Sequence, residues 1–305
     1  MTLFFTRRTY NASTSKFTNN TAALTRFVQI TSGPDSRGRW SGGIISQDDW
    51  LRAVQREART NEVTIFVHGF NNDQSEVLKR LAKIRKGLRA NGYRGAVVAF
   101  DWPSDGGVFS YDHDRNRVKE TAHFLVSDGI LPLLRRSPGL KINLIAHSMG
   151  AYAVLRGFSV FGDAAGPGAW KVNEIAFASA DVDRSWLSKG AWAALLLAHR
   201  SKRFTNYYSE KDGVLPISVL QDGFRKRAGR DGLPRLIEKR HVDVNSTDQY
   251  LKDVRPGSRS KARSHRWWFD NGTFYRDLAK SFAGTATGSI STRTPGPGSD
   301  FTLKG

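Results

Sequence analysis

The chain of 305 residues contains no cysteine, which excludes disulfide bonds, thiolate nucleophiles and cysteine-ligated metal sites. Its seven histidines show no His-Glu-x-x-His spacing, so the sequence gives no support to a metal mechanism. Apolar runs are all shorter than a membrane span, and residues 1–17 lack the apolar core of a signal peptide. We therefore expect a protein without a bound metal or a transmembrane segment, located in the cytoplasm.

Acidic residues are also scarce relative to basic ones. The chain has 28 Asp and Glu and 47 Lys and Arg, which gives a net charge of +19. Basic side chains are densest between Arg225 and Arg266. Such a basic face would attract anionic substrates, anionic lipid headgroups or nucleic acid through long-range electrostatics. A solvated surface explains the same charge without any partner, and both interpretations stay open.

The most informative segment is Lys141-Ile-Asn-Leu-Ile-Ala-His-Ser-Met-Gly150. An apolar strand pattern ends there in a small-x-Ser-x-Gly turn, and a helical pattern follows over residues 151–161. A strand-turn-helix of this kind holds the serine hydroxyl exposed at the strand end, provided that the residues two before and two after it are small. Ala146 stands where glycine is commoner. The context predicts Ser148 as a nucleophile, and the alternative is a turn serine with only local hydrogen bonds.

A serine nucleophile needs a base, an orienting acid and an oxyanion hole. We predict His265 as the base, because it follows the last strand-like run and precedes a helical C-terminal segment. Two acids compete: Asp212 lies in the polar loop that ends the strand-like segment over residues 203–213, and Asp181 lies at the end of the preceding one, over residues 173–183. We favour Asp212, because it keeps the chain order of nucleophile, acid and histidine at the acid's usual place. Asp181 is then a helix cap or a brace near the turn.

The oxyanion hole is expected to use the backbone N–H groups of Phe70 and Met149. Phe70 follows the His-Gly pair that ends the apolar strand pattern within residues 62–70, and Met149 opens the helix after the nucleophile. His68 is interpreted as a residue that braces this loop. His147 is interpreted as support for the turn, because strand alternation directs its side chain away from Ser148.

These motifs together resemble the α/β-hydrolase superfamily, and more narrowly a bacterial hydrolase-like family of unknown function. The pieces that carry the resemblance are Phe66-Val-His-Gly-Phe70, Phe100-Asp-Trp-Pro-Ser104 with Gly106, Tyr111 and Asp114, His147-Ser-Met-Gly150, Ala180-Asp-Val-Asp183, Tyr208-Ser-Glu-Lys-Asp212 and Ser264-His265. The resemblance implies an α/β-hydrolase fold, a mostly parallel central sheet with helices on both faces. Alternating strand and helix patterns agree with that architecture.

Composition and pattern divide the chain into three parts. Residues 1–60 form an N-terminal extension with possible edge strands, 61–283 form the hydrolase catalytic domain, and 284–305, rich in Gly, Ser, Thr and Pro, form a tail predicted to be disordered. We expect a serine hydrolase that cleaves a small-molecule or lipid-like carboxylic ester through an acyl-enzyme, with no cofactor. The alternative is a non-catalytic hydrolase scaffold that binds nucleic acid or an anionic membrane through its basic face. The oligomeric state is left open.

Overall fold

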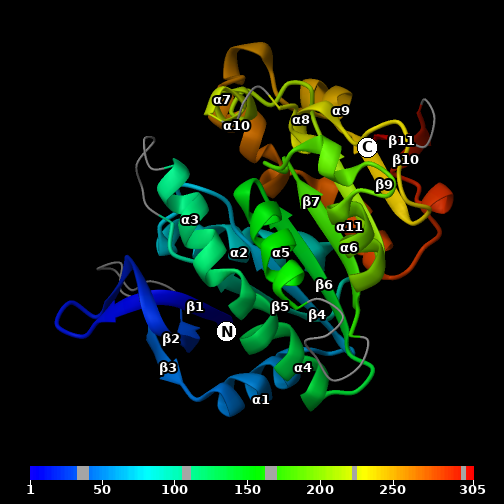
Figure 1. Cartoon of the computed structure of the whole chain (residues 1–305). Helices are drawn as coiled ribbons and strands as arrows, with labels where there is room; N and C mark the ends of the chain where they lie inside the picture. Colours follow the sequence, from blue (N-terminus) through cyan, green and yellow to red (C-terminus); the bar gives the residue numbers. More distant parts are fainter. Residues whose placement is uncertain (33–40, 105–110, 162–169, 222–224, 297–299) are drawn as a thin grey trace.

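A computed structural model describes residues 1–32, 41–104, 111–161, 170–221, 225–296 and 300–305. Within them the strands form one 11-stranded sheet in the order β10-β11-β9-β8-β7-β6-β4-β5-β1-β2-β3 (Figure 1). All neighbours from β11 to β1 are parallel, and only the β1–β2, β2–β3 and β10–β11 pairs are antiparallel. The predicted fold, a mostly parallel sheet with helices, is confirmed.

The strands of the sheet are β1 (Thr2–Asn11), β2 (Lys16–Ser32), β3 (Ser41–Ile45), β4 (Glu62–Val67), β5 (Ala96–Asp101), β6 (Lys141–His147), β7 (Val172–Ala178), β8 (Ser201–Tyr208), β9 (His241–Asn245), β10 (Arg293–Pro295) and β11 (Asp300–Leu303). The α-helices are α1 (Gln47–Glu57), α2 (Gln74–Ala90), α3 (Tyr111–Thr121), α4 (Leu131–Arg136), α5 (Met149–Val160), α6 (Trp192–Arg200), α7 (Leu215–Gln221), α8 (Ala228–Asp231), α9 (Thr247–Asp253), α10 (Lys261–Arg266) and α11 (Gly272–Phe282). A π-helical turn, η1 (Leu125–Ile130), precedes α4. Short 3-10 turns are η2 (Arg184–Leu187), η3 (Pro256–Ser258), η4 (Trp267–Asp270) and η5 (Thr287–Ser289).

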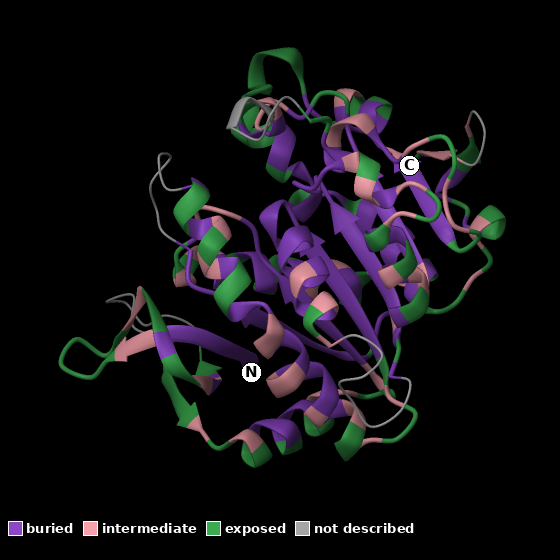
Figure 2. Cartoon of the chain, in the orientation of Figure 1, coloured by how far each residue is buried: buried purple, intermediate pink, exposed green. Residues whose placement is uncertain are grey.

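Alternation along the strands creates two apolar layers, one on each face of the sheet. In β4, Val63, Ile65 and Val67 face the layer beneath α1, α3, α4, α5 and α6. Phe66 faces the opposite layer, where α2, α9, η4 and α11 pack. Figure 2 shows buried central strands between helices whose outer sides are exposed. Helices on both faces explain why the central strands are almost continuously apolar.

The N-terminal residues add strands at one edge of the sheet. β1 pairs in parallel with β5, and Phe5 of β1 is fully buried against Phe100 and Trp50. Residues 1–60 therefore share the hydrophobic core of the segment that follows them.

The prediction of a disordered tail is wrong for the described part of residues 284–305. β11 pairs in parallel with β9, and β10 pairs with β11. Leu303 is 1% exposed, and the guanidinium of Arg293 forms a fully buried ion pair with Asp277, with Nη2 2.6 Å from Oδ1. These contacts outweigh a composition that is poor in apolar residues.

No helix in the described ranges is both long and apolar enough to cross a membrane.

Candidate active site

Ser148 occupies a strained turn between β6 and α5. Its φ of 55° and ψ of −126° lie where non-glycine residues are rare. A Cβ at Gly150 would collide with the carbonyl oxygen of Val67, and one at Gly69 would lie 2.7 Å from the Cβ of Ser148. The turn therefore requires glycine at both positions, and it holds Ser148 at the carboxyl end of the central strand β6, where Ala146 is fully buried.

His265 and Asp212 meet through a hydrogen bond of 2.7 Å from imidazole Nδ1 to carboxylate Oδ2. The other carboxylate oxygen of Asp212 accepts from the N–H groups of Val214 at 3.0 Å and Leu215 at 3.2 Å. Burial opposes ionisation of Asp212, but the nearby imidazole and these hydrogen bonds outweigh burial and lower its pKa. The carboxylate thus stays ionised and fixes a proton on Nδ1, which leaves Nε2 as the acceptor.

The helix that carries His265 is joined to both the acid loop and the nucleophile strand. Gly213 N–H donates to Ser264 Oγ at 2.9 Å, which connects α10 to the loop after β8. His147 Nε2 donates to the carbonyl oxygen of His265 at 2.8 Å. Burial, followed by the charges of His265 and Arg80, lowers the pKa of His147 well below its usual value. His147 is therefore a neutral donor that positions the backbone of His265. Among the described residues, Ser148 Oγ and His265 are not hydrogen-bonded, and such bonds are often long in substrate-free enzymes.

The competing acid, Asp181, is engaged elsewhere. Its carboxylate accepts from Tyr111 Oη at 2.9 Å and Ser218 Oγ at 2.7 Å, and Oδ1 lies 3.2 Å from Arg227 Nε. The backbone N–H of Asp181 donates to the carbonyl oxygen of Ser148 at 3.1 Å. Asp181 thus braces the nucleophile turn, and the structure brings Asp212, not Asp181, to His265.

Phe70 and Met149, the expected oxyanion donors, flank Ser148 from two elements. Met149 is the first residue of α5, where the N–H has no partner within the helix. Phe70 follows Gly69, which closely approaches Ser148. In the described part of the chain, neither N–H donates to a protein acceptor, so both are available to a developing oxyanion.

The loop that carries Phe70 is braced by residues that the sequence did not reveal. Arg8 of β1 donates from Nε to Asp101 at 2.8 Å and from Nη2 to the carbonyl oxygen of Asn72 at 2.7 Å. Asn72 in turn donates to the carbonyl oxygens of Gly69 at 2.7 Å and Phe70 at 2.8 Å. No local motif marks Arg8, because its partners lie 64 and 93 positions away in the chain.

His68 belongs to the same network, and among the described residues it forms no hydrogen bond or ion pair with His265 or Ser148. Its Nε2 lies 3.2 Å from Asp101 Oδ1, and its ring stacks on Trp102 with centroids 5.0 Å apart. Trp102 Nε1 donates to the carbonyl oxygen of His68 at 2.8 Å. This is the arrangement of a residue that braces a loop.

Of the remaining motif residues, Gly106 lies outside the described residues, and Asp114 accepts a hydrogen bond from Ser104 Oγ at 2.6 Å.

The run of basic residues that begins at Arg225 is not wholly a free surface. Arg225 lies 3.3 Å from Asp183, and Arg227 is 1% exposed beside Asp181. Over the described ranges, no three His, Asp or Glu side chains are grouped as a metal site would need.

Comparison with known proteins gives weak individual similarities. The uncharacterized protein alr1448 of Nostoc sp. (strain PCC 7120) is 42% identical over 60 residues, which are 19% of this chain and 15% of that protein. This chain thus matches less than a sixth of that relative's length. A "Putative hydrolase" from Agrobacterium vitis S4 covers 86% of this chain and 95% of its own, at 12% identity and a TM-score of 0.42. A lipase-esterase related protein from Clostridium acetobutylicum ATCC 824 covers 50% of this chain and 76% of its own, at 13% identity and a TM-score of 0.28.

A family model described as alpha/beta hydrolase of unknown function (DUF900) matches residues 45–232. The match includes β4, β6, the turn at Ser148 and Asp212, and it ends before His265. The chain therefore belongs to this family of α/β hydrolases of unknown function.

Proposed function

We propose that this α/β hydrolase is a carboxylic ester hydrolase that uses Ser148, His265 and Asp212 through an acyl-enzyme. The observation that carries the proposal is the 2.7 Å His265–Asp212 hydrogen bond. It is joined through His147 to the strand whose next residue is the strained Ser148.

The residues have distinct roles in the proposed reaction. Ser148 Oγ attacks the ester carbonyl carbon while His265 Nε2 takes the hydroxyl proton. Asp212 stabilises the resulting imidazolium, and the N–H groups of Phe70 and Met149 stabilise the tetrahedral oxyanion. His265 then gives its proton to the departing alcohol. Water attacks the acyl-enzyme with the same histidine as base, and the acid is released.

The proposed substrate is a small-molecule or lipid-like ester, because the group that reacts with this constellation is an acyl carbonyl. The Asp181–Arg227 ion pair is buried, at 7% and 1% exposure, and the backbone N–H of Asp181 donates to the carbonyl oxygen of Ser148. Both charges are used within the protein, so we assign them to support of the turn.

Hydrolysis of a chromogenic ester series of increasing acyl length tests this proposal. Ser148→Ala should lose activity on every member by several orders of magnitude. Ser159→Ala is the matched control, because Ser159 lies on the same helix and only donates to the carbonyl oxygen of Arg156. Ester hydrolysis by Ser148→Ala at the wild-type rate, or no hydrolysis of any member by the wild type, would contradict the proposal.

A further inference from the structure

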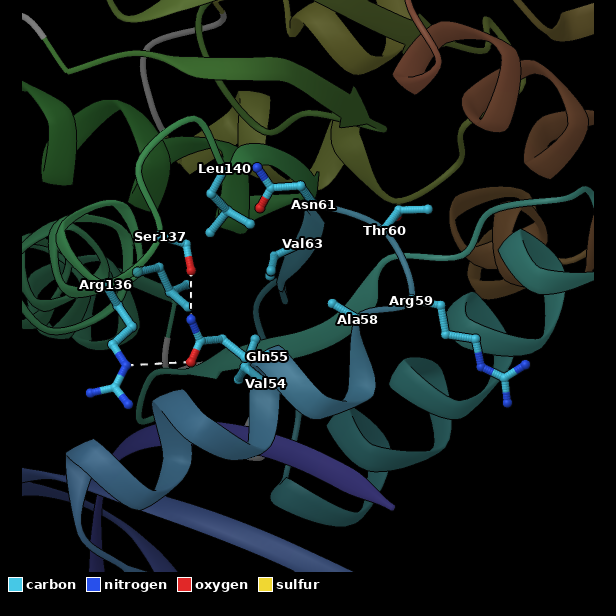
Figure 3. Close-up of a pocket in the computed structure, with 11 residues that line it drawn as sticks. Val54, Gln55, Ala58, Arg59, Thr60, Asn61, Val63, Arg136, Ser137 and Leu140 are labelled. Atoms are coloured by element: carbon cyan, nitrogen blue, oxygen red, sulfur yellow. Dashed lines mark hydrogen bonds between the residues drawn. The ribbon is translucent and has the colours of Figure 1, made fainter.

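A cavity of about 360 Å³ lies between α2, α10 and η4, and its lining does not include Ser148. Its basic and aromatic lining includes Lys79, Arg80, Arg263, Arg266, Trp267 and Phe269. Phe269 contacts His147 with ring centroids 5.0 Å apart, so this cavity adjoins the side of His147. It differs from the cavity in Figure 3, which lies between α1, α4 and the segments that follow these two helices and is lined by residues such as Gln55, Asn61 and Arg136. There, Gln55 donates to Ser137 and accepts from Arg136, so these three polar side chains are paired with one another.

Arg80 is the unusual member of the lining. The residue is 5% exposed, and its guanidinium carbon lies 5.4 Å from the centroid of the Phe269 ring. Among the described residues, no carboxylate or carbonyl oxygen accepts a hydrogen bond from it. Burial, and then the charge of Arg266, lowers the pKa of Arg80 to about 10. The group is therefore still a cation at neutral pH, and a buried cation without a counter-ion is costly.

The charges of Glu76 and Asp73 act favourably on Arg80, but neither carboxylate forms an ion pair with it in the described part of the chain. Glu76 pairs with Lys79 at 2.9 Å, and Asp270 pairs with Lys83 at 2.7 Å. Asp253 accepts hydrogen bonds from Gln249 and Asn271.

Three guanidinium groups, those of Arg80, Arg263 and Arg266, therefore line the cavity without an ion pair in the described part of the chain. The indole N–H of Trp267, also in the lining, is buried without an acceptor. Among the described residues these donors have no protein acceptor, because the carboxylates of the lining are bonded to other side chains.

We propose that this cavity binds a phosphate-type oxyanion, a phosphomonoester that is either free or carried as a lipid headgroup. Guanidinium forks match phosphate oxygens bidentately, and a lining with more cations than carboxylates suits a dianion better than a monoanionic carboxylate. The cavity volume falls in the range of small-molecule sites, which leaves room for the group that bears the phosphate. The anion would join α2 to α10, the helix that carries His265. The site does not use Ser148, so it does not depend on the proposed hydrolase reaction.

Thermal unfolding with inorganic phosphate, against chloride at equal ionic strength, tests the site. The wild type should gain on the order of 3–5 °C in Tm at phosphate roughly 100-fold above Kd. Arg80→Met, which keeps the apolar contact with Phe269, should lose this gain while its Tm in chloride is equal to or above that of the wild type. Arg255→Gln, an exposed residue outside the cavity, should keep the gain and controls for general charge effects.

Two further arms identify the source of the anion and protect the test against misfolding. Phenyl phosphate represents a free phosphomonoester, and vesicles of phosphatidylcholine with and without phosphatidic acid represent a headgroup. Arg266→Gln changes an exposed lining residue and should weaken phosphate binding about tenfold in a folded protein. Arg80- or Arg266-dependent binding of phosphate or phenyl phosphate supports a free ligand, and such binding confined to phosphatidic acid vesicles supports a headgroup. The proposal is overturned if no arm shows binding that depends on these two arginines, or if Arg255→Gln removes it equally.

Discussion

Arg8 Nε lies 2.8 Å from Asp101 Oδ1, and both side chains are completely buried. Burial raises the cost of charge on Asp101, but Arg8 and His68 outweigh it and lower the pKa of Asp101 to about 2. This ion pair joins β1 to β5 and, through Asn72, fixes the loop that presents Phe70. A residue at the start of the chain, outside the span that the family model matches, thus positions an expected oxyanion donor.

We predict that Arg8→Met lowers both stability and ester hydrolysis. Removing one member of a buried pair leaves an uncompensated charge, which costs about 3–5 kcal/mol. Urea unfolding should show that loss, and Lys16→Met, at an exposed position of β2, should not. Because Arg8 also holds the Phe70 loop, kcat should fall under conditions where circular dichroism shows the variant folded. Wild-type kcat in folded Arg8→Met would reduce the role of Arg8 to stability alone.

Asp212→Asn should lower kcat by about 10⁴-fold, because an amide cannot fix the proton on Nδ1 of His265. Asp181→Asn should lower kcat far less, since its partners are Tyr111, Ser218 and Arg227 and not His265. Steady-state hydrolysis of one chromogenic ester compares the two variants directly. A larger kcat loss in Asp181→Asn than in Asp212→Asn would exchange their roles.

The stability of the protein should depend on the protonation of His241. Both ring nitrogens of His241 are buried without a hydrogen-bond partner among the described residues, and burial lowers its pKa from 6.5 to about 4. The unfolded chain therefore takes up a proton before the folded chain does, and stability is lost as the pH falls from 6.5 toward 4.

Replacing His241 with leucine should remove this loss. Compared with the wild type, the free energy of unfolding of His241→Leu should improve by about 2 kcal/mol between about pH 8 and about pH 5. Urea unfolding at the two pH values measures the difference, with the exposed His113→Leu as the control. A pH-independent difference between His241→Leu and the wild type would show that His241 does not titrate as its burial requires.

The parts of the fold that the sequence predicted are those with local signals. The apolar strand into Ser148 and the chain order of Ser148, Asp212 and His265 are visible as patterns, because strand-turn-helix units and chain order follow from the fold. Asp212 could be favoured over Asp181 only by that order. The contact with His265 Nδ1 distinguishes them in the structure.

Long-range polar contacts left no such pattern. The partners of Arg8 are brought together only when β1 pairs with β5. In the sequence, Arg80 is indistinguishable from the other basic residues of an amphipathic helix. In the tail, Phe301 and Leu303 are too few to outweigh the Gly and Pro content in a compositional argument. Their burial depends on β9, which offers β11 a parallel partner.

Fluorophosphonate labelling followed by mass spectrometry of the labelled peptide tests the nucleophile most directly. We predict one covalent adduct, on Ser148, and its loss in Ser148→Ala with an unchanged circular dichroism spectrum. Labelling of folded Ser148→Ala at the wild-type rate, or no labelling of the folded wild type, would contradict the assignment of Ser148 as the nucleophile.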